Sequence, residues 1–96
     1  MRLSKWRDCN DNEEIANCAG EMAWGAICSW AQARDVKPPT TADACRELAA
    51  DICVEDGGRI VSDNDPAGDV AREVLSRNGY RVVSGHIGFD ETIAKA

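Results

Sequence analysis

The sequence predicts an α+β fold, in which an N-terminal antiparallel helix pair packs with a C-terminal βαβ unit and a small sheet of two to three strands. Apolar residues recur at steps of three and four through residues 12–54, which is the spacing of a helix face. Short β-branched runs then flank one further helical stretch. We therefore expect a single domain over residues 1–96, with the βαβ unit at 58–84 and a short tail at 85–96.

The first helix is expected over residues 12–34, and its apolar face is too wide to stay exposed. Asp11 or Asn12 is expected to cap it. Ala16 and Gly20 lie four residues apart, so a second helix can approach closely at that point. The face consists of Ile15, Ala16, Ala19, Met22, Ala23, Ala26, Ile27 and Trp30.

The second helix is expected at about residues 41–54. Pro38 and Pro39 stop the first helix because proline cannot continue one. Thr40 and Asp43 are then expected to form a capping box. Gly57-Gly58 is expected to end this helix, and the short proline turn favours an antiparallel pair.

A strand at 59–62, a helix from Pro66 and a strand at 80–84 make up the predicted βαβ unit. Asp65 before Pro66 is a strong helix start, and Asn78-Gly79 is a good left-handed helix end. The two strands are expected to be parallel.

The sheet needs a third strand, which is expected from residues 2–6 or from His86 to Phe89. Asp90 is expected to cap a last helical turn before the chain end frays.

The net charge of −6 is unevenly distributed along the chain. Residues 1–7 carry +3, which leaves −9 on the rest. An acidic body repels phosphates, so direct nucleic-acid binding is disfavoured. It suits a protein partner with a basic surface, although acidic surfaces also simply keep small proteins soluble.

Five cysteines and a single histidine give no zinc spacing, because no C-x-x-C pair occurs. The odd count, the lack of an apolar leader and the lack of a membrane-length apolar run predict a cytoplasmic protein with reduced, mostly buried cysteines. One disulfide is left open. The lone His86 suggests no catalytic base, and no cofactor is expected.

Residues 59–83 resemble the later half of a Toprim domain, a family of primases, topoisomerases and small nucleases. Asp63 and Asp65 match its D-x-D motif, and Ala67-Gly68 follow as in primase-type members. The resemblance implies a magnesium ion held by the two aspartates and a phosphotransferase or nuclease activity. The glutamate that the family places after an earlier strand has no counterpart here.

The leading interpretation is a non-catalytic inhibitor that docks on the basic, nucleic-acid-binding surface of a larger complex. The small size and acidity resemble the profile of phage-encoded inhibitors such as anti-CRISPR proteins. The minimal Toprim-like enzyme is the alternative, and a homodimer formed through the first helix is compatible with either. The acids expected to bind the partner are Asp63, Asp65 and Asp69 near one helix start, and Asp51, Glu55 and Asp56 near one helix end.

Overall fold

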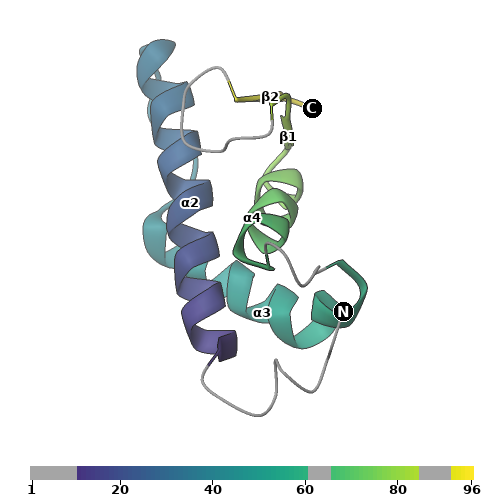
Figure 1. Ribbon diagram of the computed structural model, residues 1–96. Helices are drawn as coiled ribbons and strands as arrows, with labels where there is room; N and C mark the ends of the chain where they lie inside the picture. Colours follow the sequence, from purple (N-terminus) through teal and green to yellow (C-terminus); the bar gives the residue numbers. More distant parts are fainter. Residues whose placement is uncertain (1–10, 61–65, 85–91) are drawn as a thin grey trace.

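The computed structural model describes residues 11–60, 66–84 and 92–96, with side chains described for 13–54, 66–84 and 92–96. This part of the chain combines helices with a small antiparallel sheet (Figure 1). Its elements in chain order are α2 (Asp11–Ala33), α3 (Ala42–Ile60), α4 (Pro66–Arg77), β1 (Tyr80–Val82) and β2 (Ile93–Lys95).

Helix α2 confirms the expected first helix, but prolines do not end it. The Val36 N–H donates to the Ala31 carbonyl at 2.9 Å, and the Asp35 N–H donates to the Gln32 carbonyl at 3.2 Å. Asp35 has a φ of 54°, so these bonds form a Schellman motif with a left-handed aspartate. The helix therefore stops before the Pro38-Pro39 pair.

Helix α3 begins where it was expected, but its capping residue and its end differ from the expectation. The Thr41 Oγ1, not Thr40, accepts the Ala44 N–H at 3.1 Å and caps the helix. The helix then continues through Gly57-Gly58 to Ile60. Glycine costs about 1 kcal/mol inside a helix but, unlike proline, does not forbid it. The predicted strand at 59–62 is therefore wrong at residues 59 and 60, and residues 61–62 lie outside the described part.

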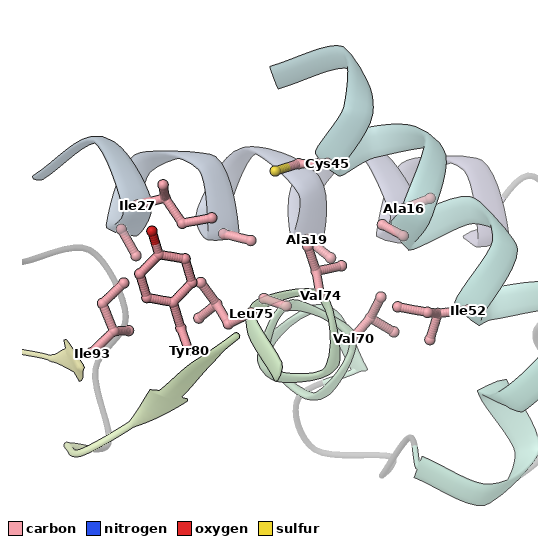
Figure 2. Close-up of a cluster of buried hydrophobic side chains, with 14 of the residues drawn as sticks. Ala16, Ala19, Ile27, Cys45, Ile52, Val70, Val74, Leu75, Tyr80 and Ile93 are labelled. Atoms are coloured by element: carbon pink, nitrogen blue, oxygen red, sulfur yellow. The ribbon is translucent and has the colours of Figure 1, made fainter. Parts of the chain in front are cut away.

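The two long helices run in opposite senses, since Gly20 of α2 lies against Arg46 while earlier residues of α2 line a groove with later residues of α3. In Figures 1 and 2, α3 crosses α2 obliquely. The crossing is tight, because a Cβ added to Gly20 would lie 2.6 Å from the Cα of Arg46. The spacing of Ala16 and Gly20 thus predicted a close helix approach correctly, while the oblique crossing was not expected.

Helix α4 packs against both α2 and α3 and closes the core. Its start at Pro66 is confirmed, and so is its left-handed end, where Gly79 has a φ of 86°. Asp65 lies outside the described residues. Figure 2 shows Val70, Val74 and Leu75 of α4 directed at the two longer helices. The buried core is rich in small residues: Ala16, Ala19, Ala23, Ala26, Cys45, Ala49, Cys53 and Ala71.

Strand β1 confirms the predicted run after α4, but its partner was not expected. Tyr80 faces Lys95 and Val82 faces Ile93 in an antiparallel register. The strand β2 thus lies in the tail that was predicted to fray. The described part contains no strand before α4 and hence no parallel pair. The alternative third strands, residues 2–6 and 86–89, and the Asp90 cap lie outside it.

Candidate protein-binding site

The six acids expected to bind a partner are only partly placed. Asp51 is exposed on α3, and Asp69 is half-buried in the first turn of α4, where its Oδ1 accepts a hydrogen bond from Arg72 at 3.3 Å. The backbones of Glu55 and Asp56 belong to α3, but their side chains are outside the described residues. Asp63 and Asp65 lie outside as well, so the magnesium alternative stays a prediction.

Helices α2 and α3 carry a marked excess of acid. Residues 13–33 and 42–54 contain six acidic residues and a single base, Arg46. All six acidic side chains are exposed. We call this set the acidic surface: Glu13, Glu14, Glu21, Asp43, Glu47 and Asp51.

Arg46 sits at the point where α3 crosses α2 and is already paired. Its Nη1 lies 4.0 Å from Glu21 Oε1 across the crossing, and its Nη2 donates to Asp43 Oδ1 one turn away. Both carboxylates are exposed, so each pair contributes little to stability. The pairing nevertheless compensates the only base of the acidic surface. A basic ligand would therefore meet little local repulsion there.

A groove lies between α2 and α3 beside this crossing, with a volume of about 190 Å³. Its floor is apolar, because Ala16 and Cys53 are buried, and Val54 stands at its edge with 80 % of its surface exposed. An exposed valine next to an apolar floor is a local surface at which a partner can bury apolar area. The lining residues are Glu13, Ala16, Asn17, Arg46, Ala50, Cys53 and Val54.

At the opposite end of α2, aromatic and cationic side chains take the place of the exposed carboxylates. Trp30 and Tyr80 meet edge to face with ring centroids 5.1 Å apart. The Arg34 guanidinium lies 4.6 Å from the Trp30 ring centre, and the Lys95 Nζ lies 4.7 Å from that of Tyr80. We call these four residues the aromatic–cation cluster. The two cations make cation–π contacts with these rings, and no described carboxylate pairs with Arg34 or Lys95.

No family model, curated protein or solved structure matches the chain. Among the described residues, no helix has the length and apolar character needed to cross a bilayer.

The cysteines were expected to be reduced and mostly buried. Cys18, Cys28, Cys45 and Cys53 are free thiols, and two of them, Cys45 and Cys53, are buried. Burial raises the pKa of Cys28 and Cys45, and raises that of Cys53 from 9.0 to about 11. These three thiols therefore stay protonated near neutral pH and are poor nucleophiles.

The described ranges place no three His, Cys, Asp or Glu side chains where they would hold a metal ion. The surface features that the structure does bring together are the acidic surface and the groove. Sequence reasoning singled out Asp51 but missed Glu13, Glu21 and Glu47 as candidate binding residues. The available signal was the scarcity of bases through both helices.

Proposed function

We propose that this chain is a small, acidic, non-catalytic protein-binding module that docks on a basic, nucleic-acid-binding surface of a larger complex and inhibits it, in the manner of anti-CRISPR proteins. The observation that carries the proposal is the acidic surface: among the described side chains of α2 and α3 there are six exposed carboxylates and one base, which is itself paired. We place the protein in the cytoplasm, in keeping with the free thiols among the described residues.

Docking of the acidic surface on such a partner would compete directly with nucleic acid. A surface that holds nucleic acid presents several Lys and Arg side chains at phosphate spacing, and much of its affinity is electrostatic. A folded protein that presents carboxylates on rigid helices can neutralise the same side chains. It would thereby exclude nucleic acid without any chemical step.

Exposed carboxylates inside and outside the acidic surface allow a direct test. Asp51 belongs to the acidic surface, whereas Asp35 is an equally exposed aspartate in the connection after α2. Three tagged proteins would be used to capture complexes from a bacterial lysate: the wild type, the double variant Asp51→Asn/Glu47→Gln, and the single variant Asp35→Asn. The captured proteins would be identified by mass spectrometry at 50 mM and 500 mM salt.

We expect the wild type and Asp35→Asn to retain a nucleic-acid-handling complex at 50 mM salt. The double variant should recover several-fold less, and 500 mM salt should release the complex because it screens exposed charges. Added nucleic acid should also displace the module. Equal recovery by all three proteins at both salt concentrations would contradict the proposal.

A further inference from the structure

The groove between α2 and α3 is too small for the usual ligand of an enzyme. Its volume of about 190 Å³ is below the range of roughly 300–1,000 Å³ that small-molecule pockets occupy. It is also open, with its apolar floor reaching the surface at Ala50 and Val54. A space of this size and character fits one apolar side chain.

The acids next to the groove lie on the same face of α3. Glu47, Ala50, Asp51 and Val54 follow each other at steps of three, one and three, so helical geometry places them in one stripe. All four are exposed. Glu13 adds a further exposed carboxylate from α2 on the other side of the groove.

We infer that the groove takes a single apolar side chain from a basic segment of the partner protein, with Lys or Arg residues on either side of it reaching Glu13, Glu47 and Asp51. The inference rests on the proposed function and specifies the partner's chemistry. The charge of this face favours a basic segment over a second copy that meets it through the same face, because that copy would bring a like-charged surface. Arg46, the base in the lining, is compensated by Glu21 and Asp43.

Two short peptides of equal charge separate the apolar contact from simple charge attraction. The full-length protein would be titrated at 50 mM salt with the pentapeptides KKLKK and KKSKK, and binding followed by backbone NMR shifts. The leucine peptide should bind about tenfold more tightly, since burying most of a leucine is worth about 1.4 kcal/mol or more. The largest shifts should fall on Ala50, Val54 and Asn17.

Matched variants locate the contact. Val54→Ser should remove about half of the leucine preference on a logarithmic scale, whereas Val36→Ser, at a valine that is 50 % exposed in the connection after α2, should leave it unchanged. Asn17→Trp fills the groove from an exposed position and should abolish the preference. Each variant's fold is checked by circular dichroism.

Several results would overturn the inference. These are equal binding of the two peptides, no binding of either, or an unchanged preference in Asn17→Trp. A dimer seen by sedimentation and lost in Val54→Ser would assign the groove to a second copy. A rise in leucine-peptide affinity in Trp6→Ser would assign it to the chain's own first residues. None of these outcomes touches the salt-dependent capture of a complex, which tests the proposed function separately.

Discussion

The two ends of α2 are built in opposite ways. Near its start, α2 meets α3 almost backbone to backbone, because Gly20 leaves no side chain between the helix and Arg46. Near its end, α2 meets the sheet through large rings, and Figure 2 shows Tyr80 reaching up toward the helix beside Ile27. The contact between α2 and α3 is close because Gly20 has no side chain, whereas the contact between α2 and the sheet is made by large aromatic side chains.

This difference bears on where charge is exposed. At the crossing, alanines, glycine and cysteines bury the contact, so the remaining positions of both helices are free to carry exposed carboxylates. At the aromatic–cation cluster Trp30 is only partly buried against the core, and the cationic side chains of Arg34 and Lys95 lie over its ring. The type of packing therefore sets the sign of the charge that each end presents.

The largest effect is expected at the ring contact. Trp30→Ala removes the edge-to-face partner of Tyr80 and the ring beneath Arg34, and should lower the free energy of unfolding by about 3 kcal/mol. Trp24 also packs partly buried against the core, but it has no ring contact within the described residues. Trp24→Ala should cost about 1 kcal/mol less. Equal losses in urea titrations would mean that the ring pair adds nothing.

The crossing is tested by two glycines of the same helix. Gly20→Ala places a methyl group against the Arg46 backbone and should destabilise by about 2 kcal/mol. Gly25 has no atom within 4 Å of an added Cβ, so Gly25→Ala should stabilise by about 0.5–1 kcal/mol. Thermal unfolding of both variants measures the contrast. An unchanged unfolding temperature for Gly20→Ala would show that the two helices can move apart at little cost in free energy.

Alkaline pH should weaken the crossing through Cys53. The pKa of the Cys53 thiol in the folded protein, about 11, lies above the ordinary 9.0. The folded state therefore favours the neutral thiol, and this contribution to the free energy of unfolding is complete below pH 9 and is lost as the pH rises toward 11. The loss is on the order of 2 kcal/mol at pH 11. Cys53→Ala should reduce the fall in unfolding free energy between pH 9 and pH 11 by that amount. An identical pH dependence in the variant would exclude Cys53 as the cause.

The smallest effect concerns the hydroxyl of Tyr80. This group is buried, with 1 % of the residue exposed, and has no hydrogen-bond partner among the described residues. Tyr80→Phe keeps the ring contact with Trp30 and should raise the unfolding free energy by about 1 kcal/mol. Burial also raises the pKa of Tyr80, so the wild type should lose stability above pH 10 that the variant keeps. Destabilisation by Tyr80→Phe at neutral pH would reveal a partner for the hydroxyl.

The elements with local signals were predictable. Apolar spacing marked α2, and proline before a helical run with Asn78-Gly79 after it marked α4. The end of α3 was harder to predict, because a pair such as Gly57-Gly58 can lie inside a helix as well as end one. Strand β2 has only three residues, and its existence depends on pairing with β1, which no local pattern encodes.

The candidate site was less predictable than the fold. Acidic character was evident, and Asp51 was named correctly as an exposed acid of α3. The groove was not foreseen, because it forms where Ala16 and Ala50 approach each other from distant positions in the sequence. Apolar spacing and the proline turn indicate an antiparallel pair, but they do not fix the crossing angle and the register that bring these two residues together.

Among the described residues, positive and negative charges are separated along α2, which is the arrangement of an electric dipole. Carboxylates gather around the α2–α3 crossing, while Arg34, Lys37, Arg81 and Lys95 belong to the other end of α2 and to the sheet. A basic partner would turn the approaching protein so that the crossing arrives first. Such orientation can raise association rates by tenfold to a thousandfold at low ionic strength. The unequal packing of one helix would thus govern how quickly, as well as where, a partner is engaged.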